Sequence, residues 1–342
     1  MTVGGQRGVR VMTRRRFWGW ILAGVLCLLG VSALTLWIGM PAVSLDTALS
    51  DPTSWEHRAF MQLQLPRLVL ALSVGATLAA TGAALQGLLR NPLADPFILG
   101  VSGGAALGST AFGLLGVAVA APIGGFAGAL VALLVVTALA TEHGRLSPLR
   151  MLLIGVIVNA LTGAMLMVLM AIADPGQAQL GLIRLMGAVG VDPSRPALVP
   201  IVAGSAIVGI AFLMAHAQRL NLLALGDETA QTLGVRPNRL RWVLFIVMSI
   251  PIGASVAVTG LIGFVGLIVP HGVRLVVGPD HRLVLPLSAL FGAAFVALAD
   301  AGVSRLAVSL QTELPVGVVT ALIGGPLFLA LLRARPRGGA PR

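Results

Sequence analysis

The sequence predicts an all-α protein that crosses a membrane many times. Of its 342 residues, 57% are hydrophobic and only 10% are charged. A water-soluble fold of this size would lack the polar residues to cover its surface. The apolar residues also gather in runs of about 20, the length of helix that crosses a bilayer core. Both observations predict a single transmembrane domain over residues 1–342, with a lipid bilayer as its surroundings.

Hydropathy predicts about ten transmembrane helices. The eight clear spans cover residues 17–39, 66–89, 122–140, 150–172, 196–216, 241–259, 284–304 and 315–332. Two further spans, 97–117 and 262–277, are short and rich in Gly and Pro. Irregular backbone at membrane depth needs protein or water to satisfy its polar groups. We therefore place these two segments in the interior of the bundle.

Small residues predict where neighbouring helices approach closely. Gly100, Gly104 and Gly108 recur every four residues, which puts them on one helical face. We interpret this spacing as a packing surface rather than a phosphate cradle. The same spacing relates Gly75 to Ala79 and Gly124 to Gly128.

The distribution of arginine predicts the orientation. All 23 basic residues are Arg, and the cytoplasmic segments of membrane proteins carry the excess of basic residues. With ten crossings, most arginines fall on the cytoplasmic side, including those of the predicted cytoplasmic tails 1–16 and 333–342. We therefore expect a multi-pass protein of the plasma (inner) membrane with both termini in the cytoplasm. The predicted outer segments keep only Arg58, Arg67, Arg184, Arg195 and Arg305.

Composition excludes several functions. Without Lys the chain cannot build a Walker A phosphate loop, so it is not its own P-loop ATPase and we expect no enzyme activity. The net charge of +11 forms no basic stripe with interleaved aromatics, so nucleic acid is not an expected partner. The five histidines are scattered and lack metal-ligand spacing. We expect this chain to bind no metal or other cofactor.

The strongly polar residues that we single out in the predicted spans are Asn159 and Asp300. Ion-coupled carriers use buried ionisable groups to move the coupling ion, so this scarcity favours an energy source outside the chain. Two alternatives are a secondary transporter, with a midplane ionisable site, and a membrane-embedded enzyme, with clustered catalytic residues.

The inner loop 217–240 predicts a short helix that ends near Gly234. Asp227 can cap its N-terminus, Glu228 favours its positive end, and Gly234 can close it with a positive φ. The residues alone leave two interpretations open: a docking element for a cytoplasmic partner, or a solvated connector.

Seven motifs follow one another after the first predicted helix. They are LPR at 65–67, GAALQGLLRNPLADP at 82–96, LGVSGGA at 99–105, LGDE at 225–228, GFVGLIVPH at 263–271, GPDHR at 278–282 and ELPVGVVT at 313–320. Together they resemble the membrane-permease family of ABC importers for iron-siderophore complexes, haem and cobalamin.

The resemblance implies a type II ABC importer permease. Such a subunit pairs with a second permease, here expected to be a copy of this chain, although a heterodimer stays open. Two cytoplasmic ATPase subunits hold ATP and Mg, and an external binding protein delivers the cargo. The implied function is to move an intact iron chelate, a ferric siderophore or haem, into the cytoplasm. A cobalamin permease of the same architecture is the alternative.

The resemblance also implies roles for individual residues. Arg67 and Arg305, with Arg58, would pair with carboxylates of the binding protein. Gln64 stands where the family commonly has a further Arg. The residues of loop 217–240 that would couple the chain to its ATPase are Leu225, Gly226, Asp227, Glu228, Thr229, Ala230, Leu233 and Gly234.

A third set of residues is expected along the substrate pathway. Arg184 stands in the outer loop 173–195 where relatives usually have Trp, and Met186 and Asn159 are placed with it. Two interpretations of Arg184 stay open: it attracts an anionic cargo, or it snorkels to the lipid headgroups.

Overall fold

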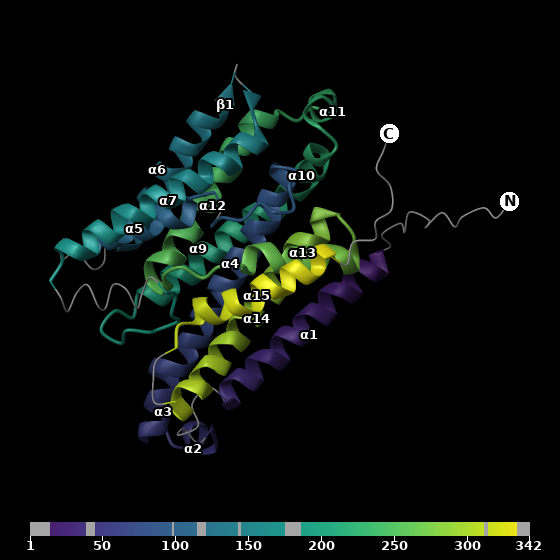
Figure 1. Ribbon diagram of the computed structural model, residues 1–342. Coiled ribbons are helices and arrows are strands. Elements are labelled where there is room, and N and C mark those ends of the chain that lie inside the picture. Colours follow the sequence, from purple (N-terminus) through teal and green to yellow (C-terminus); the bar gives the residue numbers. More distant parts are fainter. Residues whose placement is uncertain are drawn as a thin grey trace.

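The chain folds into a bundle of α-helices, which confirms the predicted fold class (Figure 1). The computed structural model describes residues 14–38, 45–97, 99–114, 121–142, 145–174, 186–310 and 314–333. Within these ranges, seven helices are long and apolar enough to cross a membrane.

The long helices lie where hydropathy places the clear spans. They are α1 (Arg14–Ile38), α4 (Leu65–Leu88), α6 (Ala121–Ala140), α7 (Pro148–Ile172), α9 (Leu198–Ala215), α12 (Pro237–Thr259) and α14 (His281–Leu310). The shorter α15 (Val316–Arg333) corresponds to the eighth span. Helix α1 begins three residues earlier than the predicted tail 1–16 allows. The remainder of both predicted tails, 1–13 and 334–342, lies outside the described residues.

The two short predicted spans begin later than hydropathy indicates. Helix α5 (Val101–Leu114) starts only after Gly100, whose φ of +76° interrupts the helical backbone. Helix α13 (Val265–Val277) starts after Phe264, which adopts a left-handed φ of +67°. The prediction that these segments lie inside the bundle is correct for the first part of each helix, because residues 101–106 and 265–268 are buried. It is wrong for the end of α13, where Leu275 and Val276 are exposed.

Glycines bring α5 and α6 into backbone contact, as their spacing predicts. A Cβ atom on Gly104 would overlap the carbonyl oxygen of Gly128, and one on Gly108 would overlap that of Gly124. Gly75 of α4 meets Gly292 of α14 in the same way. Gly100 does not share this face, because it precedes α5 and lies against Val158 of α7.

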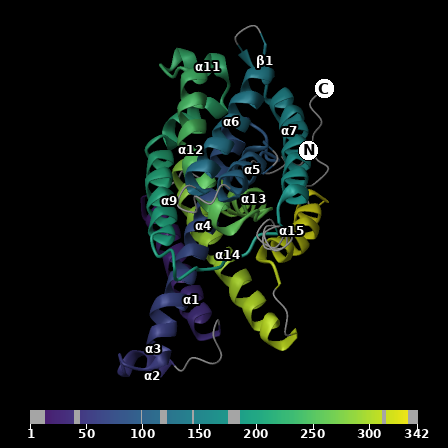
Figure 2. The same ribbon diagram turned by 90° about the vertical axis from the view of Figure 1, so that its left-hand side faces the viewer.

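Short elements mark two opposite ends of the bundle (Figures 1 and 2). Helices α10 (Ala217–Ala224) and α11 (Asp227–Thr232) lie at one end, which we call the α11 end, with the antiparallel ribbon of β1 (Thr141–Glu142) and β2 (Arg145–Leu146). Helices α2 (Leu45–Ser50) and α3 (Trp55–Ala59) lie at the other, the α3 end. A π-helical turn, η1 (Phe60–Gln64), joins α3 to α4.

Candidate functional site

Helix α11 is an exposed knob with a well-defined end. Glu228 and Thr229 are exposed, whereas Ala230 is buried. At its C-terminus Gly234 has a φ of +83° and donates its N–H to the carbonyl of Gln231 at 3.0 Å. The N–H of Val235 donates to the carbonyl of Ala230 at 2.9 Å. This pair of bonds is the Schellman ending, and it confirms the predicted closure at Gly234.

Asp227 does not cap the helix, contrary to the prediction. Gly226 takes the capping position, and Asp227 is the first residue of α11. Its carboxylate instead accepts two hydrogen bonds from the Arg241 guanidinium of α12, at 2.8 Å from Nη1 and 2.7 Å from Nη2. A bidentate ion pair is stronger than a capping hydrogen bond. This explains why Asp227 pairs with Arg241 and leaves the capping position to Gly226.

The pair of Asp227 and Arg241 anchors α11 to the membrane bundle. The side chain of Arg241 is only 1% exposed, while that of Asp227 is 35% exposed. Arg90, in the loop that follows α4, adds a longer contact to Asp227 at 3.4 Å. A buried guanidinium needs its counter-charge, so separating α11 from α12 is costly. The ion pair therefore holds α11 firmly on α12.

A second polar contact anchors α10. Asn221 donates from its side-chain amide to the Asp280 carboxylate at 2.7 Å and accepts the backbone N–H of His281 at 2.8 Å. Asp280 and His281 lie at the start of α14. The two short helices of loop 217–240 are thus each fastened to a different long helix.

The predicted spans contain more strongly polar residues than Asn159 and Asp300, so the sequence-based selection of these two was incomplete. Arg274 of α13 lies within the predicted span 262–277, where it donates to the side chain of Gln86 and, at 2.9 Å, to the carbonyl of Ala83. Both acceptors belong to α4. This arginine holds α13 against α4.

Asp95 is a further buried polar group, in the loop between α4 and α5. Burial raises the pKa of the Asp95 carboxyl to about 6, and the hydrogen bond from the backbone N–H of Phe97, at 2.7 Å, opposes this rise. Asp95 packs against Gly266, where a Cβ atom would crowd the carboxylate. The loop therefore lies against the start of α13 at this position.

The α3 end gathers the three arginines expected to dock a binding protein. Arg58 lies on α3, Arg67 near the start of α4, and Arg305 near the end of α14. Arg67 already forms a two-pronged ion pair with Asp300 of α14, with both N–O distances 2.8 Å. Arg58 and Arg305 are exposed. The docking role of all three stays a prediction, and the geometry gives Arg67 a structural role as well.

Gln64, at the position where the family commonly has a further Arg, points into the protein. It is buried, and its side-chain amide donates to the carbonyl of Leu36 at the end of α1. It fastens α1 to α4 instead of facing the exterior.

We expect the substitution Arg67→Ala to destabilise the bundle, because it leaves the largely buried Asp300 carboxylate without its partner. The expected cost is roughly 1–3 kcal/mol in detergent, measured by thermal unfolding. The double variant Arg67→Ala/Asp300→Ala should recover part of this loss, as a coupled pair requires. Additive losses from the two single variants would contradict this coupling.

The expected pathway residues are only partly described. Asn159 is half-buried on α7, and its Oδ1 fills the space above Gly103 of α5. Met186 is exposed, in a turn packed on the start of α15, where Gly317 donates to the carbonyl of Gly187 at 3.0 Å. Arg184 lies outside the described residues. The pathway role of all three stays a prediction.

Comparisons with known proteins agree on one family. Residues 21–334 match the FecCD transport family. The cobalamin import system permease protein BtuC of Halobacterium salinarum is 47% identical over 308 residues, 87% of this chain and 80% of that protein. The hemin transport system permease protein HmuU of Yersinia pestis is 39% identical over 319 residues, 89% of this chain and 88% of that protein.

A solved structure shares the fold over nearly the whole chain. It is described as an inward-facing conformation of a metal-chelate type ABC transporter, with a TM-score of 0.80 and 31% sequence identity. The match covers 93% of this chain and 99% of that one.

Proposed function

Because this chain belongs to the FecCD transport family, we propose that it is the permease subunit of an ATP-driven importer and that ATP is hydrolysed on a separate subunit. The observation that carries the proposal is the exposed helix α11, tied to α12 by the pair of Asp227 and Arg241. An exposed short helix that is held firmly to a transmembrane helix is well placed to receive another subunit and to pass its movement to the membrane helices.

The α11 end faces the cytoplasm in this proposal, and the α3 end faces outward. Supporting this, five arginines lie on α10 or close to the first residues of α7, α12 and α14, as the positive-inside rule requires for a cytoplasmic end. They are Arg150, Arg219, Arg236, Arg239 and Arg282. ATPase closure would push α11 and α10, and their polar anchors would carry this motion to α12 and α14. Rocking of two permease subunits, expected to be two copies of this chain, would then alternate access.

The proposed cargo is an intact metal complex, either a ferric chelate or haem. The hemin permease of Yersinia pestis and the metal-chelate type transporter support this class. Cobalamin is the second candidate, because the cobalamin permease of Halobacterium salinarum is 47% identical to this chain.

Reconstitution tests the proposal. The chain is placed in vesicles with its ATPase and binding protein, and accumulation of labelled ferric siderophore, haem and cobalamin is measured. We expect ATP-dependent accumulation of one metal complex that persists when an ionophore collapses the membrane potential. Accumulation without the ATPase, abolished by the ionophore, would instead establish a secondary transporter. Accumulation of cobalamin alone would select the second candidate.

The outer arginines give a separate prediction. The variant Arg58→Glu/Arg305→Glu should weaken the affinity for the binding protein at least about tenfold, because like charges would then face its carboxylates. The reduction should shrink as ionic strength rises. Arg150→Glu at the opposite end is the control, and an equal loss there would remove the α3 end as the docking surface. Surface plasmon resonance on nanodisc-embedded protein measures the affinities.

A further inference from the structure

A basic hollow lies where α9, α10 and α12 meet at the α11 end. It encloses about 370 Å³, and its lining contains three arginines and no carboxylate. The lining residues are His216, Arg219, Gly234, Val235, Arg236, Arg239, Leu240 and Val243. We propose that this hollow binds the phosphate headgroup of an anionic phospholipid, whose acyl chain runs along α12. This goes beyond the transport function and requires only that the chain spans a membrane.

The three arginines carry uncompensated charge. Arg219, Arg236 and Arg239 are all exposed, and no ion pair joins any of them to a carboxylate among the described residues. Other arginines of the α11 end do have such partners, as Arg150 with Glu142 and Arg282 with Asp280 show. Three like charges around one hollow repel each other, and a bound phosphate would offset that repulsion.

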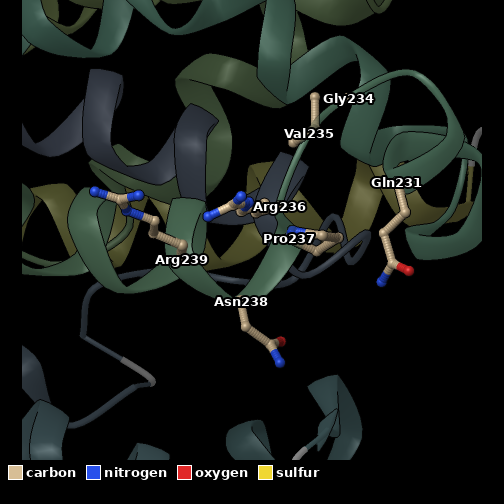
Figure 3. A pocket seen from close by; sticks show the side chains of 7 residues that line it. All are labelled: Gln231, Gly234, Val235, Arg236, Pro237, Asn238 and Arg239. Atoms are coloured by element: carbon tan, nitrogen blue, oxygen red, sulfur yellow. The ribbon is translucent and has the colours of Figure 1, made fainter.

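Two of the arginines, Arg236 and Arg239, point in the same direction. Figure 3 shows the adjoining hollow of about 670 Å³, in which the side chains of Arg236 and Arg239 point to one side. Gln231 of α11 lies on the opposite side of this view, and Asn238 points downward, away from both arginines. Gln231 and Gly234 at the end of α11 nevertheless line this hollow together with Arg236 and Arg239. The basic residues therefore border the helix that we assign to the ATPase, and the test must distinguish a lipid from a protein contact.

An exposed apolar face continues from the basic hollow along α12. Val243, Ile246 and Ile250 follow Arg239 at intervals of four, seven and eleven residues, which places all four on one helical face. Val243, Ile246 and Ile250 are 36%, 41% and 44% exposed. A cationic group above an aliphatic face matches a phospholipid, whose phosphate and acyl chain lie one above the other. A soluble phosphate would match the basic part alone.

Native mass spectrometry of the full-length chain, purified with defined lipids, tests the proposal. We expect retained phosphatidylglycerol in preference to phosphatidylcholine, and a loss of about tenfold or more in the variant Arg219→Gln/Arg236→Gln/Arg239→Gln. The matching variant with three lysines should retain the lipid. The control Arg150→Gln/Arg282→Gln removes two paired arginines from the same end and should leave retention unchanged.

Two further measurements distinguish lipid binding from the binding of another anion. The variant Val243→Asn/Ile246→Asn should weaken lipid retention, and inorganic phosphate at millimolar concentration should not displace the lipid. Equal retention of phosphatidylcholine, full retention by the three-glutamine variant at an unchanged unfolding temperature, or displacement by inorganic phosphate would each overturn the proposal. Loss of ATPase binding with unchanged lipid retention would show a protein contact instead.

Discussion

The substitution Arg241→Leu is expected to reduce ATP-driven uptake strongly while leaving the permease able to bind its ATPase. Leucine fills much of the buried space of Arg241 but cannot hold the Asp227 carboxylate, so α11 loses its ion pair with α12. We expect uptake in reconstituted vesicles to fall at least about tenfold, because α11 can then move without moving α12. ATPase binding is measured separately by co-purification.

The control for this variant is Arg90→Ala. Arg90 contacts the same carboxylate at 3.4 Å, and its side chain is 43% exposed. Exposed ion pairs contribute little, so uptake should change less than twofold. Full uptake by Arg241→Leu, or equal losses in both variants, would show that this ion pair does not transmit the motion of α11.

The substitution Gly108→Val should prevent stable assembly of the bundle. A Cβ atom at this position meets the backbone carbonyl of Gly124, which cannot move aside without displacing α6. Overpacking against side chains costs about 1–3 kcal/mol, and a rigid backbone should raise the cost to the upper end of that range or beyond. Detergent-solubilised yield and the unfolding temperature measure the effect.

Gly113→Val is the matched control on the same helix. Nothing lies within 4 Å of a Cβ atom at Gly113, so this variant shows the lower helix propensity of valine alone. A loss of stability at Gly113 equal to that at Gly108 would mean that close approach of α5 and α6 is not what the glycines provide.

The positions of the helices along the chain are predicted well from the sequence, because a lipid bilayer places a simple requirement on every segment that crosses it. Long apolar runs must be helical to satisfy their backbone groups, so their positions follow from composition alone. The spacing of Gly104 and Gly108 likewise predicts a close helix contact, since three and four residues separate neighbours on one helical face. Both predictions depend on local patterns.

The polar contacts of the candidate site could not be predicted, because they join residues distant in sequence. Arg67 and Asp300 are 233 positions apart, and only the packing of α4 on α14 brings them together. Asp227 has the sequence context of a capping residue, but tertiary structure supplies Arg241 as a stronger partner. From the sequence, Gln64 is interpreted as a surface position that lacks the family's arginine, but in the fold its side chain is buried against α1.

Cysteine protection tests most directly whether α11 receives the ATPase. The only native cysteine, Cys27, is first replaced by alanine. Single cysteines are then introduced by Glu228→Cys on α11 and by Ser50→Cys on α2, both at exposed positions. Maleimide labelling of each variant in nanodiscs, with and without the ATPase subunit, gives the protection at either end of the bundle.

The account predicts that the bound ATPase slows labelling at position 228 severalfold and leaves labelling at position 50 unchanged. Unchanged labelling at position 228 with the ATPase bound, or protection at position 50 instead, would contradict it.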